Sequence, residues 1–415
     1  MQWSSRAMLR LLIVNILDRE EKIMAEWVER KISDIGTVVG GATPSTKKPE
    51  NYEDGKIAWI TPKDLSTFSS RYIEHGERNI TEIGLKSCST QLLPPNTILF
   101  SSRAPIGYVA IAANEVCTNQ GFKSVVPNEN TDPLFLYYLL KYNKDKIEGM
   151  GSGTTFKEVS GNTMKNIVVS VPTDKEVQKK ISSMLGSIDD KIEENERINN
   201  NLEQQMAALY KSWFVDYTPF DGIKPETWIE SDIYSISDII YGAPFKSKLF
   251  NTEKIGKPII RIRDLKEQTF VTYTTEEHPK GYSLKYGDIV VGMDGEFRPY
   301  IWGNEEAWLN QRVCVFNNKR QKGKAFLLYT LKPLLNHIEQ TQVATTVIHI
   351  GKKDFDAFKL YLPDDKVLDE FDEITSPMIW QIVNNSLENK RLATLRDSLL
   401  PKLMSGEINV SEITI

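Results

Sequence analysis

The chain carries one pattern of residues twice. The segment "CTNQGFKSVVPN" at 117–128 is answered by "WLNQRVCVFNNK" at 308–319, so that Asn119-Gln120 and Asn310-Gln311 stand 191 residues apart. Each half is too long to be one unit of a solenoid, and the pattern therefore indicates a duplicated domain. A length of 415 residues is also large for a single hydrophobic core, which favours two domains plus connectors.

The repetition continues on both sides of this pair. Matching segments are "EWVERKISDIGTVVGGATPS" and "TWIESDIYSISDIIYGAPFKS", "IAWITPKDL" and "PIIRIRDL", "PLFLYYLLKY" and "AFLLYTLKPLL", and "TTFKEVSGNTMKNIVVSVP" and "TTVIHIGKKDFDAFKLYLP". Each half runs through short strands with Gly and Pro turns, one helix and a closing strand. This order predicts a small α+β domain that is rich in strands.

A long helix is predicted after each domain. Apolar residues recur there at alternating steps of three and four, which is the seam of a coiled coil. Each seam is interrupted twice by asparagine, at Asn195 and Asn199 in the first helix and at Asn385 and Asn389 in the second. Buried asparagines weaken a seam but fix its register and partner. If the two helices pair antiparallel, a pseudo-two-fold axis relates the domains; alternatively, each helix packs only on its own domain.

These patterns divide the chain into seven segments. Met24 opens "MAEWVERKISDIG" like a natural start, so the residues before the first domain are an N-terminal extension or a start-site artefact. The predicted segments are 1–25 (extension), 26–173 (first domain), 174–215 (first helix), 216–227 (linker), 228–363 (second domain), 364–405 (second helix) and 406–415 (tail).

The acidic net charge is not spread evenly. The whole chain carries −5, yet residues 27–173 hold 16 Lys and Arg against 15 Asp and Glu, and residues 228–363 hold 19 against 16. The excess of acidic residues therefore lies in the helices and connectors, and the charge of the two domains does not exclude a nucleic-acid ligand.

Several classes of protein are disfavoured by what the sequence lacks. The three cysteines form no CxxC pair and the four histidines have no metal-ligand spacing, so we expect reduced thiols, no metal site and a cytoplasmic location. No apolar run is long enough for a transmembrane helix. A phosphate-binding loop GxxxxGK[ST], a methylation motif and a clear nuclease triad are also missing.

The duplicated segments quoted above occur in the same order in both halves, and together they are specific enough to indicate a family. With "SWFVDYTPFDGIKPETW" at the central junction and "LRDSLLPKLMSGEI" near the C-terminus, the chain resembles the DNA-specificity (S) subunit of type I restriction–modification systems from about Glu26 to Glu407. The resemblance implies two target-recognition domains, each of which reads one half of a split, asymmetric DNA sequence.

The resemblance also implies partners. Such subunits have no catalysis of their own and bind two copies of an N6-adenine methyltransferase, largely through the helices. A third subunit, an ATP-driven translocase and nuclease, joins them for cleavage. S-adenosylmethionine, ATP and magnesium would then belong to those partners, and this chain would bind no cofactor.

Side chains that suit DNA contacts occur in loops of both domains. Arginine pairs well with guanine, whereas serine, threonine and lysine suit phosphates or mixed contacts. The candidates are Lys63, Ser101, Ser102, Arg103, Thr154, Thr155 and Lys157 in the first domain and Arg261, Arg263, Arg298, Thr345 and Thr346 in the second. Arg103 and Arg298 are the strongest, because specific contacts should come from loops that differ between the halves.

Other roles stay open for many of these residues. Lys63-Asp64 and Arg263-Asp264 could form local ion pairs, and the threonine pairs could be helix caps or strand residues. The duplicated Asn-Gln pairs are interpreted as scaffold or phosphate-positioning residues, because residues shared by both halves cannot distinguish two different half-sites.

Apolar residues at the helix ends are candidates for docking a partner subunit. They are Trp213, Phe214 and Tyr217 after the first helix, and Leu399, Leu400, Leu403 and Met404 at the end of the second. The alternative for them is packing inside the chain.

Two other classes of function remain as alternatives. One is a single-chain restriction enzyme fragment with its own nuclease activity, for which "DDKVLDEFDE" (364–373) supplies carboxylates, although a solvated helix face explains them equally. The other is a coiled-coil scaffold that reads no DNA.

Overall fold

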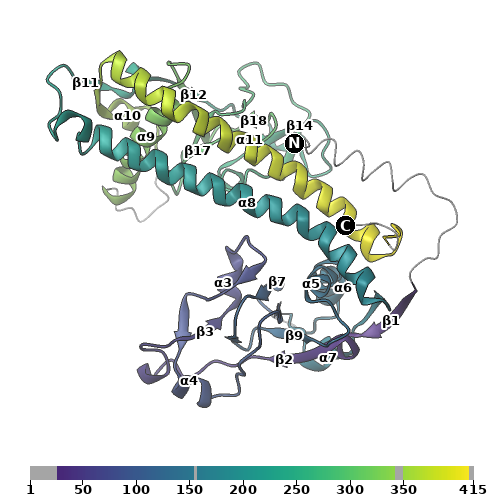
Figure 1. Cartoon of the computed structure of the whole chain (residues 1–415). Helices are drawn as coiled ribbons and strands as arrows, with labels where there is room; N and C mark the ends of the chain where they lie inside the picture. Colours follow the sequence, from purple (N-terminus) through teal and green to yellow (C-terminus); the bar gives the residue numbers. More distant parts are fainter. Residues whose placement is uncertain (1–25, 154–156, 342–348, 411–415) are drawn as a thin grey trace, which may run out of the picture. The chain divides into compact units, whose positions relative to one another are not determined.

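A computed structural model describes residues 26–153, 157–341 and 349–410. The chain forms two compact units, one of residues up to Asp190 together with Ala393 onward, and one of Lys191–Leu392. The predicted N-terminal extension 1–25 lies outside the described residues, as do the last five residues of the predicted tail. Figure 1 shows strands and helices mixed within each unit.

The α+β domain of unit 1 contains ten strands and six α-helices among its described residues. They are β1 (Trp27–Lys31), α2 (Ile32–Ile35), β2 (Gly36–Gly40), β3 (Ile57–Ile60), α3 (Pro62–Ser66), β4 (Tyr72–Ile73), β5 (Arg78–Ile80), α4 (Glu82–Lys86), β6 (Ile98–Ser102), β7 (Ile106–Ala112), β8 (Val116–Thr118), β9 (Lys123–Pro127), α5 (Pro133–Tyr142), α6 (Lys144–Gly149), α7 (Gly161–Asn166) and β10 (Val168–Pro172). The sequence predicted one helix here, which corresponds to α5. The others have four to six residues, too few for periodicity to reveal them.

The strands of unit 1 form three sheets. The largest has the order β2-β9-β6-β7-β4, a second has the order β5-β3-β8, and β1 pairs antiparallel with β10. The apolar side of the largest sheet packs on α5, whose residues Phe135 to Leu140 are all buried. Strand β1 thus closes on the last strand of the domain, which brings Trp27 opposite Pro172.

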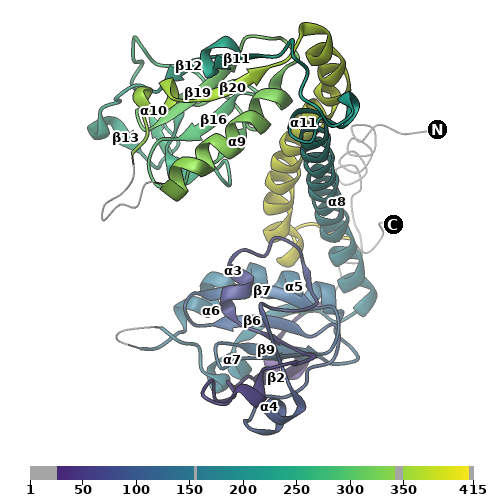
Figure 2. The same ribbon diagram turned by 90° about the vertical axis from the view of Figure 1, so that its left-hand side faces the viewer.

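The α+β domain of unit 2 repeats this plan. Its elements are β11 (Ile229–Asp232), β12 (Ser237–Tyr241), β13 (Phe250–Asn251), β14 (Lys257–Ile260), β15 (Thr272–Thr274), β16 (Ile289–Gly292), β17 (Pro299–Ile301), β18 (Trp308–Leu309), β19 (Val313–Asn318), α9 (Lys324–Thr341), α10 (Lys352–Asp356) and β20 (Lys359–Leu362). The order β12-β19-β16-β17 matches β2-β9-β6-β7, and the antiparallel pair β11-β20 matches β1-β10. In Figure 2, α9 (light green) lies across this sheet.

Two long helices follow the domains. Helix α8 spans Lys175–Phe214 and α11 spans Asp365–Met404, 40 residues each. Each helix contributes to both units, because the unit boundaries fall within them, after Asp190 and after Leu392. The predicted division into successive segments therefore differs from the compact units, in which each domain is packed with parts of both helices.

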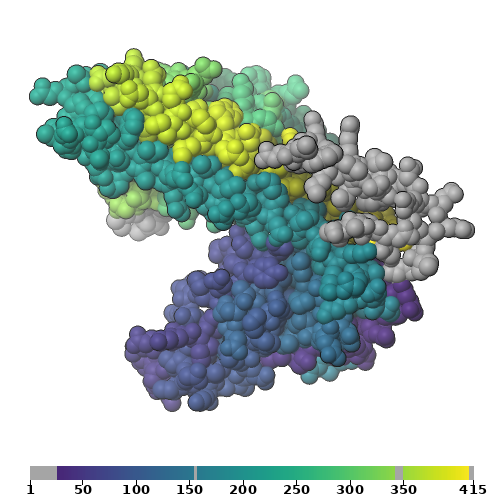
Figure 3. Space-filling view, in the orientation of Figure 1, coloured from purple at the N-terminus to yellow at the C-terminus, as the bar shows by residue number. Residues whose placement is uncertain are grey.

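The two helices pair antiparallel within each unit. In unit 2, Asn195 donates to Asn389 at 2.8 Å and Asn385 donates to Asn199 at 2.8 Å. In unit 1, Arg396 donates to Asp189 at 2.7 Å. Along these three contacts the residue numbers rise in α8 and fall in α11, as they do in an antiparallel pair of helices. The space-filling view shows both helices at the surface, with α8 in teal and α11 in yellow (Figure 3). The predicted α+β class with a duplicated domain and paired helices is confirmed.

Candidate nucleic-acid interface

The duplicated Asn-Gln pairs form equivalent turns. In unit 1, β3 and β8 run parallel, and the N–H of Asn119 donates to the carbonyl of Ile60 at 3.0 Å. In unit 2, β14 and β18 run parallel, and the N–H of Asn310 donates to the carbonyl of Ile260 at 3.2 Å.

Both asparagine side chains are also used inside their turns. The Asn119 amide oxygen accepts from the Gly121 N–H at 2.8 Å, and the Asn310 amide oxygen accepts from the Gln311 N–H at 2.6 Å. These hydrogen bonds give the asparagines a scaffold role. They leave the exposed Gln120 and Gln311 as the members of each pair that lie at the surface.

A glycine is required beside each turn. A Cβ on Gly41 would lie 2.2 Å from the carbonyl oxygens of both Thr118 and Asn119, and a Cβ on Gly242 would lie 2.0 Å from the carbonyl oxygen of Asn310. The chain directly after β2 and after β12 therefore passes so close to the turn that only glycine, which has no Cβ, fits there.

The duplicated Asp-Leu motif places one aspartate in each domain, and its carboxylate holds the loop that follows β3 in unit 1 and β14 in unit 2. Asp64 accepts from the N–H of Thr61 at 2.7 Å and from the N–H of Glu77 at 2.7 Å. Asp264 accepts from the N–H of Arg261 at 3.0 Å, in the equivalent place. These carboxylates are N-terminal caps, which satisfy backbone donors that the short helical turns leave free.

The cations next to these aspartates have different partners. Lys63 is 78% exposed and pairs with Glu77 at 2.7 Å, whereas Arg263 lies 3.6 Å from Asp264. The local ion pair proposed as an alternative for Arg263 is therefore present. Lys63 has a carboxylate partner farther along the chain, and the hydrogen bond that Lys63 donates to Glu77 raises the pKa of Lys63.

The β6–β7 turn corrects one expectation. Ser101 and Ser102 are fully buried, and their hydroxyl groups donate to the carbonyls of Pro105 at 2.8 Å and Gly121 at 3.1 Å. Because both hydroxyl groups are bound inside the domain, the two serines shape this turn, and neither presents a contact surface to DNA. The turn also contains a cis peptide bond before Pro105.

Arg103 is the member of this turn that lies at the surface. Its guanidinium is 3.5 Å from the Glu158 carboxylate, and both side chains are more than one-third exposed. Lys123 approaches the other oxygen of Glu158 at 3.4 Å. Two cations thus share one carboxylate, which leaves a net positive charge at the turn. Lys157, beside Glu158, is exposed.

Arg298 occupies the corresponding place in unit 2. It is the last residue of the loop between β16 and β17, and it donates to both carboxylate oxygens of Glu339 at 2.6 and 2.7 Å. These hydrogen bonds raise the pKa of Arg298, which stays charged at any working pH. Its side chain is 45% exposed, so the guanidinium faces solvent beside its partner.

A second basic group, on the turn between β18 and β19, contacts the same loop. Arg312 is 3.6 Å from Asp294 and hydrogen-bonds His349 at 3.0 Å, while His349 meets Asp294 at 2.6 Å. Arg312 is 54% exposed. The sequence analysis missed it, although it directly follows the duplicated Asn310-Gln311 pair, which was the available signal.

The Arg261 side chain is less exposed than its predicted role as a DNA contact implies. Its guanidinium donates to Thr272 at 3.0 Å and lies over the ring of Phe250, and the side chain is half-buried. The candidates Thr154, Thr155, Thr345 and Thr346 lie outside the described residues. The structure thus brings Arg103 together with Lys123 and Glu158, and Arg298 together with Glu339; none of these partners was singled out from sequence.

The predicted docking residues at the end of α8 pack within unit 2. Phe214 lies 4.9 Å from both Phe326 and Phe371, and Trp213 lies 5.7 Å from Phe371, measured between ring centroids. Tyr217 stacks edge-on against Trp228 at 5.7 Å. These contacts favour the alternative of packing inside the chain, although all three side chains keep some exposed area.

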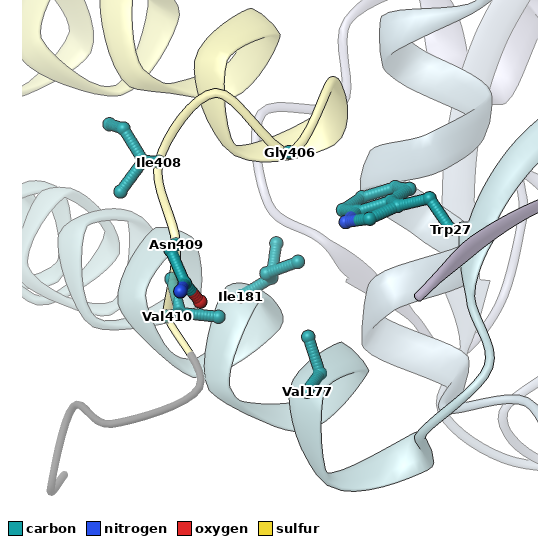
Figure 4. A pocket seen from close by; sticks show the side chains of 7 residues that line it. All are labelled: Trp27, Val177, Ile181, Gly406, Ile408, Asn409 and Val410. Carbon is teal, nitrogen blue, oxygen red and sulfur yellow. The ribbon is translucent and has the colours of Figure 1, made fainter. Parts of the chain in front are cut away.

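The predicted docking residues at the end of α11 belong to the core of unit 1. Leu403 and Met404 are buried, which corrects the expectation that they face a partner, whereas Leu399 and Leu400 are partly buried against the same core. Gly406, at φ +76°, then turns the chain back beneath Trp27. Figure 4 shows the small apolar hollow between them, lined by Trp27, Val177, Ile181, Gly406, Ile408, Asn409 and Val410.

Among residues 26–153, 157–341 and 349–410, no three His, Cys, Asp or Glu side chains gather as metal ligands do. Within the same ranges, no helix combines the length and apolarity that a membrane crossing requires.

Comparison with known proteins agrees with this architecture. The family described as type I restriction modification DNA specificity domain matches residues 24–204 and 225–395, one match for each half. The MjaIX specificity subunit of a type I restriction enzyme from Methanocaldococcus jannaschii is 34% identical over 94% of this chain and 96% of its own length. The HindI specificity subunit from Haemophilus influenzae is 24% identical over 93% of this chain and 100% of its own length.

A solved structure shares the fold. The S subunit of a type I restriction–modification system from M. genitalium has a TM-score of 0.58 and 16% identity, and the match covers 93% of this chain and 98% of that one. The family match over both halves and the full-length relative carry the assignment. The chain therefore belongs to the family of type I restriction–modification DNA-specificity subunits and has two target-recognition domains.

Proposed function

We propose that this subunit binds double-stranded DNA with both recognition domains and that each domain reads one half of a split, asymmetric target. The observation that carries this proposal is the contrast between scaffold and loops. The turns at Asn119 and Asn310 have the same backbone hydrogen bond to the neighbouring parallel strand, whereas the nearby loops present Arg103 in one domain and Arg298 in the other. A shared frame with different loops suits two related readers of different sequences.

The proposed contacts are the exposed cations of these loops. In the first domain they are Arg103, Lys63 and Lys157, and in the second they are Arg298, Arg263 and Arg312, with Arg261 as a partly covered neighbour. Thr154, Thr155, Thr345 and Thr346 remain candidates from sequence. An arginine held by one carboxylate is pre-oriented and can exchange part of that contact for guanine or a phosphate.

We further propose that the chain itself catalyses neither methylation nor cleavage. Two copies of a DNA adenine methyltransferase would supply methylation with S-adenosylmethionine, and a restriction and translocase subunit would supply cleavage with ATP and magnesium. All of these would act in the cytoplasm of a prokaryotic cell. The family of the chain and the duplicated domain support this division of labour, since two similar domains offer two similar places for a methyltransferase.

Mapping of methylated adenines tests the proposal. The chain and its methyltransferase would be expressed together in a host without DNA methylation, and the methyltransferase alone would be the control. A new motif with two defined halves around a fixed gap is expected. A soluble complex that methylates no defined motif would contradict it and favour a scaffold, and magnesium-dependent cutting by the purified chain alone would favour a nuclease.

A further inference from the structure

The two long helices are equivalent position by position. A shift of 190 residues places α8 on α11, aligning Asn195 with Asn385 and Asn199 with Asn389. Under this shift the two asparagine contacts exchange places, since Asn195 meets Asn389 and Asn385 meets Asn199. The asparagine layers would therefore form equally well between two copies of one half, and they fix register without fixing the partner.

One buried layer breaks this equivalence. In unit 1, Arg396 of α11 donates to Asp189 of α8 at 2.7 Å, and the hydroxyl of Tyr138 donates to the other carboxylate oxygen at 2.6 Å. Asp189 is 4% exposed. The shift maps Asp189 onto Ile379 and Arg396 onto Met206, and both of these residues are buried in the apolar core of unit 2.

The surrounding tyrosines follow the same difference. Tyr138 of α5 corresponds to Tyr329 of α9. Because Ile379 offers no acceptor, the hydroxyl of Tyr329 donates instead to the backbone carbonyl of Glu203 at 2.6 Å. In each unit the tyrosine hydroxyl thus has a hydrogen-bond acceptor, which is the Asp189 carboxylate in unit 1 and a backbone carbonyl in unit 2.

A second, more exposed contact has the same asymmetry. Lys191 lies 3.6 Å from Glu388, and the shift maps these residues onto Gln381 and Ile198, which form no ion pair. Its exposure makes this contact weak, so the discrimination rests on the buried layer.

Pairing of like halves would separate these partners. If the N-terminal halves (residues 26–214) of two chains paired, Asp189 would face Met206 of the second copy. If the C-terminal halves (residues 228–404) of two chains paired, Ile379 would face Arg396 of the second copy. The first arrangement buries Asp189 without Arg396, and the second leaves Arg396 with only the exposed Asp397 beside it on the same helix. Both losses cost more than burying either the complete ion pair or the two apolar residues.

We propose that the Asp189–Arg396 layer selects pairing between unlike halves and excludes like-with-like association between two copies of this chain. The layer acts against wrong partners as well as for the right one, in the way that specific coiled coils do. The inference rests on the duplicated helices and does not depend on which DNA is read.

The test is reassembly of a nicked chain. A protease site placed at Asp221-Gly222, in the exposed linker, lets the folded full-length protein be cut into its two halves. The cut protein is unfolded in urea, refolded and weighed by native mass spectrometry, which distinguishes the unlike pair from the two like pairs. Unlike pairs should exceed like pairs by about 100-fold in the wild type.

A variant with two apolar layers should lose this preference. Asp189→Ile and Arg396→Met give unit 1 the two apolar residues of the unit 2 layer, and Tyr138→Phe removes the hydroxyl that would lose its carboxylate acceptor. About half of the refolded pairs should then be like pairs. The exchanged variant Asp189→Arg with Arg396→Asp is the matched control and should stay selective. A wild-type mixture of all three pairs, or an apolar variant that forms only unlike pairs, would overturn the proposal.

A measurement on the uncut chain covers the case in which the halves fail to reassemble. Arg396→Met leaves the buried Asp189 without its counter-ion, and Asp189→Ile leaves Arg396 with only the exposed Asp397 of its own helix. Both single variants should therefore melt at a lower temperature than the double variant that carries Asp189→Ile and Arg396→Met together. Single variants that melt at or above the temperature of the double variant would sink the idea, because the layer would then carry no penalty for mismatched partners.

Discussion

Arg298 and Glu339 join the β16–β17 loop of the second domain to helix α9. The guanidinium of Arg298 donates to both oxygens of the carboxylate, and the same carboxylate accepts from the backbone N–H of Phe297 at 2.5 Å. Glu339 thus holds the loop as well as the arginine. The pair could serve the loop's shape alone or could present Arg298 to DNA, and substitutions separate these roles.

Replacing Arg298 with Ala should alter one half of the methylated motif and leave the other half and the gap unchanged, because the first domain is untouched. A lost bidentate contact to a base removes roughly 1–3 kcal/mol of discrimination. Glu339→Gln keeps the arginine and should lower overall methylation while the motif stays the same. Mapping methylated adenines for both variants decides the matter; an unchanged motif in Arg298→Ala would show that the arginine does not read the sequence.

Gly41→Ala should destabilise unit 1, whereas Gly40→Ala should not. A Cβ on Gly41 would lie 2.2 Å from two backbone carbonyl oxygens, while a Cβ on Gly40 has nothing within 4 Å. Overpacking against backbone costs about 1–3 kcal/mol, and Gly40→Ala should be neutral or slightly stabilising. Urea unfolding of the two variants provides the comparison. Equal stabilities would contradict the close approach of this strand to the Asn119 turn.

Arg320→Ala should cost far more stability than Lys322→Ala. Arg320 bridges the loop before α9 to the first turns of α11, where it meets Asp365 at 2.7 Å, Asp372 at 3.2 Å and also Asp369. Asp372 is 2% exposed, so its carboxylate would lose a buried counter-ion, at about 2–3 kcal/mol. Lys322 and Glu373 form an exposed pair worth less than about 1 kcal/mol. Thermal unfolding in low and high salt measures both, and similar losses would exclude this explanation.

The sequence predicted the long helices and the duplication because both depend on local patterns. The steps of three and four predicted helix over 174–215, and α8 spans Lys175–Phe214. The parallel pairing of β3 with β8 could not be predicted, because it joins Ile60 to Thr118 across intervening strands. Likewise, the short helices such as α3 depend on a capping aspartate and on tertiary packing, for which five residues give no periodic signal.

The candidate site was predictable in residue type and less so in exposure. The repeated loops directed attention to Arg103 and Arg298, and both lie at the surface. Ser101 and Ser102 belong to the same run of letters, yet a strand buried on both sides takes them inward. The carboxylates that hold the two arginines are 55 and 41 residues away along the chain, a separation at which no sequence pattern indicates contact.

Alkaline stability should depend on Cys117. Burial raises the pKa of this thiol to about 11 from an ordinary value of 9.0. Between these two values the unfolded chain loses the thiol proton and the folded chain keeps it, so the folded state becomes less stable as the pH rises. The loss approaches ~1.4 kcal/mol per pH unit from this group and is negligible below about pH 8. Urea unfolding from pH 8 to about 11 should show a steeper decline for the wild type than for Cys117→Ala. Parallel curves for the wild type and Cys117→Ala would mean that the thiol beside the Asn119 turn is open to solvent.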